Sequence, residues 1–272
     1  MSAPRSALAL ALALALTSLV WTAAPAAEPA RPDFTGIWTF YIPPGPRPAG
    51  AAGGGGFGGP PATLPYTPEG KNRVAAYQKL LGPERANPAA YCVDYGMPSM
   101  MENAGGYPIE FIQKPDQLTI IYEVEGEMRR VFMGERRIPP EKRIPTRQGY
   151  SIGHWEGQTL VVETTDLEDG QDQMMHPHSE DAKIVERFSL ATDDKGTKVL
   201  SYEMTMTDPV YYTEPVKTQK KWMPLVNGYI ITYRCPDEFW LALLDARREQ
   251  LKAGKPADAK MSDVYKAREA KE

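Results

Sequence analysis

The chain has 272 residues, of which 24% are charged, and a formal net charge of −4 at pH 7. A mildly acidic chain without a basic block argues against nucleic acid or an anionic membrane as the main partner. The N-terminus combines one positive charge, an apolar run and an Ala24-Pro25-Ala26 cleavage pattern. It predicts a signal peptide over residues 1–26 and a periplasmic or secreted protein with no membrane span after cleavage. An uncleaved anchor is the alternative.

The rest of the chain fits one domain over residues 27–252. Its first predicted strand, Gly36 to Ile42, runs into residues 43–62, which are mostly Gly, Pro and Ala. Such a segment buries too little apolar surface to offset its ordering entropy, so we expect a disordered loop. Thr67 and Pro68 suit the N-cap and first position of a short helix that continues to Leu81.

From residue 109 onward, apolar and polar residues alternate with the period of β-strands. The predicted strands are residues 109–115, 117–124, 127–133, 151–157, 158–165, 183–191, 198–207, 216–224 and 228–234. Short spacing and regular turns favour a mainly β, antiparallel up-and-down barrel, with a sandwich as the alternative. Closure removes exposed strand edges. A C-terminal helix over residues 237–251 should pack on the barrel, and residues 253–272 should form a loose charged tail.

The two cysteines, Cys92 and Cys235, both lie in the part of the chain that would be exported. An even number of cysteines in an exported chain predicts a disulfide, here between the early chain and the last predicted strand. Two free thiols are the alternative.

Two of the three histidines lie in the stretch MMHPHSED, residues 174–181. Pro177 favours an extended backbone, which would place His176, His178 and Glu180 on one face. Three interpretations remain open. The stretch is a polar turn on a barrel rim, a metal-free acid–base site, or a zinc site with those three side chains as ligands.

Charged side chains also occur on strand faces that are otherwise apolar. Arg130 lies on one such face and Glu186 on another, in a different strand. Tyr122 lies on an apolar face of a third strand. Buried charges are paired or functional, so the alternatives are a structural ion pair and a substrate site. Tyr211 and Tyr212 follow a turn and are expected near the barrel mouth, where they would contact a substrate.

The Gly36-x-Trp38 pattern resembles the opening of lipocalin-like (calycin) barrels, in which the tryptophan plugs the closed end. A wider resemblance is to a large, mostly uncharacterised family of exported bacterial proteins. It rests on DFTGIW, YTPEGKNRVAAYQKLL, GYPIEFIQKPDQLTIIYE, RRVFM, GYSIGHWEGQTLVVETT, HPHSED and IVERF. The resemblance implies an architecture and candidate residues, not a reaction. Arginine is more usual in the family at the position of His154, which argues against a three-histidine metal site.

The chain has no nucleophile elbow, phosphate loop or dinucleotide fingerprint. Calycin-like barrels with this layout include cofactor-independent decarboxylases of phenolic acids, which use tyrosine, arginine and glutamate. The leading hypothesis is a cofactor-independent lyase or isomerase that transfers a proton on a small apolar or aromatic molecule. His176 and His178 would form its centre, Glu186 and Tyr122 would assist, and Arg130 would anchor an anionic group. The alternatives are a non-catalytic carrier of a small hydrophobic ligand and a single-zinc hydrolase or lyase. The oligomeric state stays open.

Overall fold

The computed structural model describes residues 30–42, 64–82, 93–102, 107–135, 137–172, 176–233 and 238–264. The chain divides into two compact units, Met1–Ala30 and Arg31–Glu272. All helices and strands below belong to the second unit. The predicted signal peptide, the Gly- and Pro-rich loop and both cysteines, Cys92 and Cys235, lie outside the described residues.

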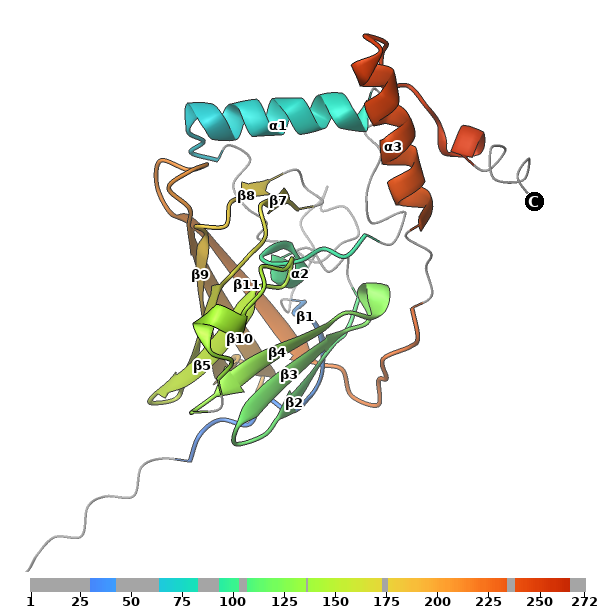
Figure 1. Cartoon of the computed structure of the whole chain (residues 1–272). Helices are drawn as coiled ribbons and strands as arrows, with labels where there is room; N and C mark the ends of the chain where they lie inside the picture. The colour runs from blue at the N-terminus through green and yellow to red at the C-terminus, as the bar shows by residue number, and fades with distance from the viewer. Residues whose placement is uncertain are drawn as a thin grey trace, which may run out of the picture. The chain divides into compact units, whose positions relative to one another are not determined.

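A closed barrel is the main feature of the second unit (Figure 1). Its strands in the described chain are β1 (Gly36–Phe40), β2 (Ile109–Gln113), β3 (Gln117–Tyr122), β4 (Met128–Met133), β5 (Tyr150–Glu156), β6 (Thr159–Thr165), β9 (Lys183–Thr192), β10 (Lys198–Thr207) and β11 (Val216–Pro224). They neighbour one another in the order β1, β11, β10, β9, β6, β5, β4, β3, β2. The prediction of a mainly β, closed barrel is therefore confirmed.

One pair of barrel strands departs from the antiparallel prediction. Strands β4 and β5 run parallel, with Val131 opposite Ser151 and Met133 opposite Gly153. Parallel neighbours need a long connection, and the Pro- and Arg-rich segment between these strands provides it. The expectation of a wholly antiparallel barrel is wrong here. At Gly153 the missing side chain leaves room for Met133 and Val131, whose side-chain atoms would meet a Cβ.

The predicted last strand, residues 228–234, is also wrong over its described part. Residues 228–233 contain no strand, and Tyr229 and Ile231 are exposed. Strand β1 already pairs with β11 on one side and β2 on the other, so the barrel has no free edge for another strand.

Helices and a small hairpin gather at one end of the barrel (Figure 1). They are α1 (Pro68–Leu81), α2 (Ser99–Glu102), α3 (Glu238–Lys252) and the short pair β7 (Gly170–Gln171) and β8 (Pro177–His178). The described chain also contains two 3-10 turns, η2 (Val124–Gly126) and η3 (Pro140–Lys142), outside this group. As predicted, Thr67 caps α1, because its hydroxyl accepts a hydrogen bond of 3.0 Å from the Gly70 amide. The same hydroxyl donates to the Val210 carbonyl at 2.7 Å, which ties α1 to the loop before β11.

The C-terminal helix forms as predicted, but its apolar stripe packs differently. Trp240, Leu243 and Leu244 are buried against Leu81 of α1 in a cluster separate from the barrel core. Residues 257–264, part of the segment expected to be loose, pack on the same cluster and bond to Arg247. No helix in the described part of the chain is long and apolar enough to cross a membrane.

The barrel interior is a packed core rather than an open cup. Aromatic rings meet across it, with 6.0 Å between the ring centres of Phe111 and Phe188 and 5.5 Å between those of Tyr202 and Trp222. Trp38 is buried and donates from Nε1 to the Phe34 carbonyl at 2.8 Å. Polar groups that could act on a ligand are therefore to be sought mainly at the ends of the barrel.

Candidate functional site

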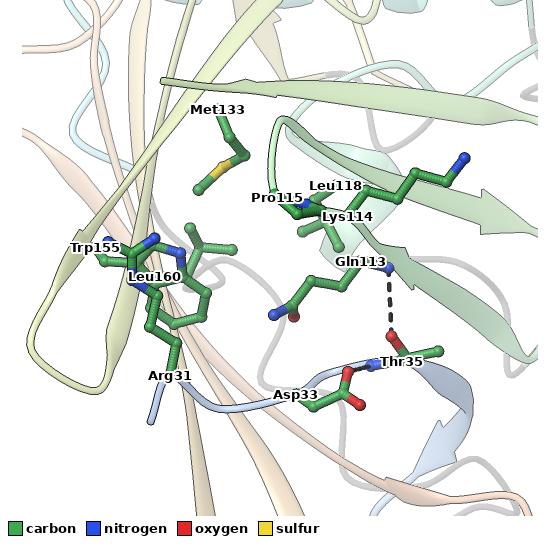
Figure 2. Close-up of a pocket in the computed structure, with 10 residues that line it drawn as sticks. All are labelled: Arg31, Asp33, Thr35, Gln113, Lys114, Pro115, Leu118, Met133, Trp155 and Leu160. Carbon is green, nitrogen blue, oxygen red and sulfur yellow. Dashed lines mark hydrogen bonds between the residues drawn. The ribbon is translucent and has the colours of Figure 1, made fainter. Parts of the chain in front are cut away.

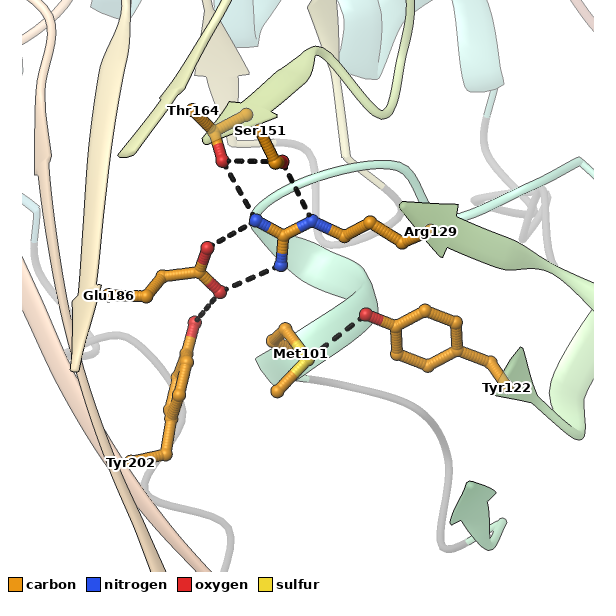
Figure 3. A network of polar contacts seen from close by, with 7 residues as sticks. All are labelled: Met101, Tyr122, Arg129, Ser151, Thr164, Glu186 and Tyr202. Atoms are coloured by element: carbon orange, nitrogen blue, oxygen red, sulfur yellow. Dashed lines mark hydrogen bonds and ion pairs between the residues drawn. The ribbon is translucent and has the colours of Figure 1, made fainter. Parts of the chain in front are cut away.

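A buried ion pair crosses the barrel interior (Figure 3). Arg129 of β4 donates to both carboxylate oxygens of Glu186 on β9, at 2.9 Å to Oε1. It also donates to the hydroxyls of Ser151 at 3.1 Å and Thr164 at 2.8 Å. Tyr202 donates to Glu186 at 3.1 Å. The two charged side chains are 1% and 0% exposed, so this network neutralises its own charges away from solvent.

The prediction chose the wrong arginine for this position. Arg129 points into the barrel, whereas Arg130 lies on the outer face, where it lines a cavity of about 330 Å³. The sequence MRRVFM carries apolar residues on both faces, and a slip of one residue exchanges the two faces. Met128 is exposed and Met133 is buried, which settles the register. Arg130 therefore does not anchor an anion inside the barrel.

The inward position predicted for Glu186 and Tyr122 is confirmed, and both side chains are engaged within the core. The Tyr122 hydroxyl contacts the Met101 sulfur at 3.0 Å on α2. Burial raises the pKa of Tyr122 above its usual value, so the phenol stays protonated. Glu186 is fully engaged by Arg129 and Tyr202. This cluster has the properties of a structural network.

His176 has a different environment at the helix-covered end of the barrel. Its Nδ1 lies 3.1 Å from Asp172 Oδ2, and its backbone amide donates to Asp172 Oδ1 at 2.8 Å. The Asp172 side chain is 1% exposed and that of His176 is 20% exposed. Burial acts to lower the pKa of His176, but the hydrogen bond and charge of Asp172 and the charge of Glu102 outweigh it and raise that pKa.

A second carboxyl lies close enough to His176 for their charges to interact. Glu102 ends α2, is 2% exposed and accepts a hydrogen bond of 2.6 Å from Thr218. Burial, helped by the charge of Asp172, raises the pKa of Glu102 to about 7. Lys220 on β11 donates to the Glu102 carbonyl, and burial lowers the pKa of Lys220 to about 8. Burial thus brings the pKa values of Glu102 and Lys220 close to neutral pH from opposite directions.

Tyr211 and Tyr212 are buried and hold the hairpin that carries the histidines. The Tyr212 hydroxyl donates to the Pro177 carbonyl at 2.8 Å, and its ring centre lies 5.3 Å from that of Tyr66. The Tyr211 hydroxyl donates to Asp169 at 2.7 Å, and burial raises its pKa to about 12. Both phenols are thus engaged in positioning β7 and β8.

His178 does not share the environment of His176. It is 4% exposed, and its Nδ1 is buried without a hydrogen-bond partner among the described residues. Burial lowers the pKa of His178. It lines a cavity of about 220 Å³ beside α3.

The expected common face of His176, His178 and Glu180 is wrong. Ser179 bonds through its amide and hydroxyl to Asp208, at 2.7 and 2.9 Å. A turn follows immediately, and Glu180 is exposed. Within the described residues, no group of three or more His, Cys, Asp or Glu side chains could hold a metal ion. The histidine stretch therefore supplies two separate environments rather than one three-ligand face.

The third histidine lies on the outer face of the barrel, away from this site. His154 is half-exposed on β5, with its Nε2 3.4 Å from Glu156 and its Nδ1 3.9 Å from Glu163. It takes no part in the cluster around His176.

Another cavity, of about 360 Å³, lies among the turns of the barrel strands (Figure 2). Leu118, Met133 and Leu160 contribute apolar surface, and Arg31 lies over the ring of Trp155 at 5.8 Å. None of the predicted catalytic residues lines it.

The prediction missed Asp172, Glu102, Arg129 and Lys220. The position of Lys220 could have been predicted from the period of two in β11. Lys220 shares the buried face of that strand with Val216, Thr218 and Trp222. Asp172 precedes His176 by four residues, a spacing that a tight hairpin brings together. Glu102 gave no such signal, since α2 is too short for a periodic pattern.

No family model, no curated protein and no solved structure matches this chain significantly. What the protein does is therefore inferred from its own side chains.

Proposed function

We propose that this protein is an exported, cofactor-independent lyase or isomerase that transfers a proton on a small apolar or aromatic molecule. Its centre is the pair Asp172 and His176 with Glu102 beside it. One observation carries the proposal: a partly exposed imidazole is held at Nδ1 by a buried carboxylate, 3.1 Å away. His178, Arg130, Tyr122 and Glu186, which the sequence suggested for this centre, are not part of it.

Each group of the proposed centre would have its own role. A carboxylate only accepts, so the Nδ1 of His176 carries the proton shared with Asp172, and Nε2 of the neutral ring accepts a proton from substrate. Glu102, with a pKa of about 7, is populated in both protonation states near neutral pH and can return a proton. Lys220 contributes a positive charge that would stabilise an anion formed on the substrate.

The surroundings favour an apolar or aromatic substrate. The rings of Tyr66 and Tyr212 pack together next to the hairpin, and Met101 precedes Glu102 on α2. The barrel would then be of the lipocalin-like type, with its reactive groups at the helix-covered end. Export would follow from the predicted signal peptide.

The proposal is tested by proton exchange. The protein is incubated in D₂O with small aromatic acids and ketones that carry an acidic C–H, and deuterium uptake and decarboxylation are followed by NMR. His176→Ala and Glu102→Gln should each lower the rate on an active substrate by about 10²-fold or more. His178→Ala is the matched control and should retain most of the rate. Full activity in His176→Ala would overturn the proposal.

A non-catalytic carrier is the second candidate, and the cavity beside Trp155 favours it. Its volume of about 360 Å³ falls in the range of small-molecule sites. Binding there would change the fluorescence of Trp155, and Trp155→Phe would remove that change. If apolar ligands bind with that signature and no substrate exchanges protons, the protein is a carrier.

A further inference from the structure

A cleft separates α3 from the loops at the end of the barrel. It consists of two adjoining cavities, of about 220 and 480 Å³, which share lining residues. The shared residues are Val93, Asp94, Arg147, Glu168 and Leu241. The smaller cavity is also lined by aromatic side chains, Tyr77 of α1 and Trp240 of α3. The combined space is large enough for a small organic molecule.

One residue that lines the smaller cavity has a buried ring nitrogen without a hydrogen-bond partner among the described residues. His178 lines it and is 4% exposed, yet its buried Nδ1 has no hydrogen-bond partner among the residues that the structure describes. The ring already interacts with the Glu168 backbone. A buried polar atom without a partner is costly, so a ligand that donates a hydrogen bond to Nδ1 would remove this cost.

The larger cavity has more acidic than basic groups. Arg147 is its basic residue, and it pairs with Asp94 at 2.5 Å and with Glu168 at 3.1 Å. Glu127 also lines this cavity and has Gln148, a neutral amide, as its hydrogen-bond donor. Burial, together with the charge and hydrogen bond of Asp94, raises the pKa of Glu127 to about 8. The hydrogen bond from Gln148 therefore brings no positive charge to the Glu127 carboxyl.

We propose that this cleft is a binding site for a small organic ammonium ion. The ammonium group would donate to Glu127 and Asp94, and a second donor on the ligand would reach the Nδ1 of His178. The aromatic wall suits the carbon skeleton of such a ligand and can attract its charge. The ammonium charge would stabilise the ionised form of Glu127, whereas a neutral polyol would satisfy only His178. The site goes beyond the proposed catalytic centre, because none of its residues belongs to that centre.

Calorimetry on the full chain tests the site with two amines, 1,4-diaminobutane and 2-phenylethylamine. Their neutral counterparts, 1,4-butanediol and 2-phenylethanol, are the ligand controls. At least one amine should bind more than tenfold tighter than its alcohol. Equal affinity of amines and alcohols, or no binding of either amine, would overturn the proposal.

Protein variants locate the binding. Glu127→Gln keeps the shape of the side chain and should weaken amine binding about tenfold or more, and His178→Leu should weaken it through loss of the acceptor. Glu203→Gln, on the exposed face of β10, is the matched control and should leave the affinity unchanged. An unchanged affinity in Glu127→Gln contradicts the assignment. His176→Ala should also bind amines with unchanged affinity. A failure of the amine site can therefore be distinguished from a failure of the catalytic proposal.

Discussion

Two polar clusters of this barrel contain similar residues but differ in their exposure to solvent. In the interior, Arg129 and Glu186 lie with their side chains 1% and 0% exposed, and three hydroxyl groups complete their hydrogen bonds. At the helix-covered end, Asp172 holds one nitrogen of a His176 ring that remains 20% exposed. The first cluster is closed to ligands, whereas the second leaves an imidazole edge accessible.

Arg129 and Glu186 show that charges on apolar strand faces can form a closed ion pair. The two clusters differ in whether each buried charge has a counter-charge and a full set of hydrogen bonds. Burial acts to lower the pKa of Arg129, but the charge and hydrogen bonds of Glu186 outweigh it and raise that pKa. Glu102 lacks a full counter-charge, and burial holds its pKa at about 7. Incomplete pairing, rather than burial alone, makes a group reactive.

The largest expected effect comes from breaking the interior pair. Arg129→Met leaves the Glu186 carboxylate buried without its cation, which costs about 3–5 kcal/mol of unfolding free energy. Urea denaturation followed by circular dichroism measures this loss. The variant should fold less stably even though methionine fits the apolar surroundings.

The adjacent arginine provides the control for that experiment. Arg130→Met changes an exposed side chain on the outer face of the same strand and should alter the unfolding free energy by less than about 0.5 kcal/mol. Equal losses in the two variants would contradict the assigned register of β4.

The second prediction concerns the pH dependence of stability. The usual pKa of a glutamate is 4.5 and that of Glu102 is about 7, so between these values the folded chain holds a proton that the unfolded chain has released. Stability is therefore highest below pH 4.5 with respect to this group and falls as pH rises toward 7, by roughly 3 kcal/mol. Glu102→Gln should remove that fall.

The effect of Glu102 is isolated as a difference between proteins. Burial also raises the pKa values of Glu125 and Glu127, to about 8 each, but their contributions are present in wild type and variant alike. Glu203→Gln, on the exposed face of β10, should give the same dependence of unfolding free energy on pH as the wild type. A Glu102→Gln curve parallel to that of the wild type would show that Glu102 is not buried as described.

The fold was predictable to the extent that local patterns determine it. The alternation of β3 and β9 and the cap at Thr67 give the correct elements, because burial on one face leaves a clear period. The parallel pairing of β4 with β5 could not be predicted, since pairing is set by tertiary contacts. The inward face of β4 was predicted wrongly for a local reason, because MRRVFM carries apolar residues on both faces.

The candidate site was predictable only in part. His176 was found because histidines are rare in this chain. Its partners are brought to it by the hairpin of β7 and β8 and by α2, which are too short to leave a periodic signal. The turn at Glu180 follows the bonds from Ser179 to Asp208, which no local rule specifies.

The smallest effect tests the Asp172–His176 contact without a change of shape. Asp172→Asn removes the carboxylate charge and replaces one of its two acceptor oxygens with an NH2 donor. The raising effect of Asp172 is then lost, and the pKa of His176 should fall. An NMR titration of the imidazole protons measures this directly, with the signal of His154, which contacts Glu156 instead, as the internal reference. The pKa of His178 should fall less, because Asp172 affects it through charge and burial dominates there. A larger fall at His178 than at His176 would reverse the assignment of the two histidines and move the reactive imidazole to the cleft beside α3.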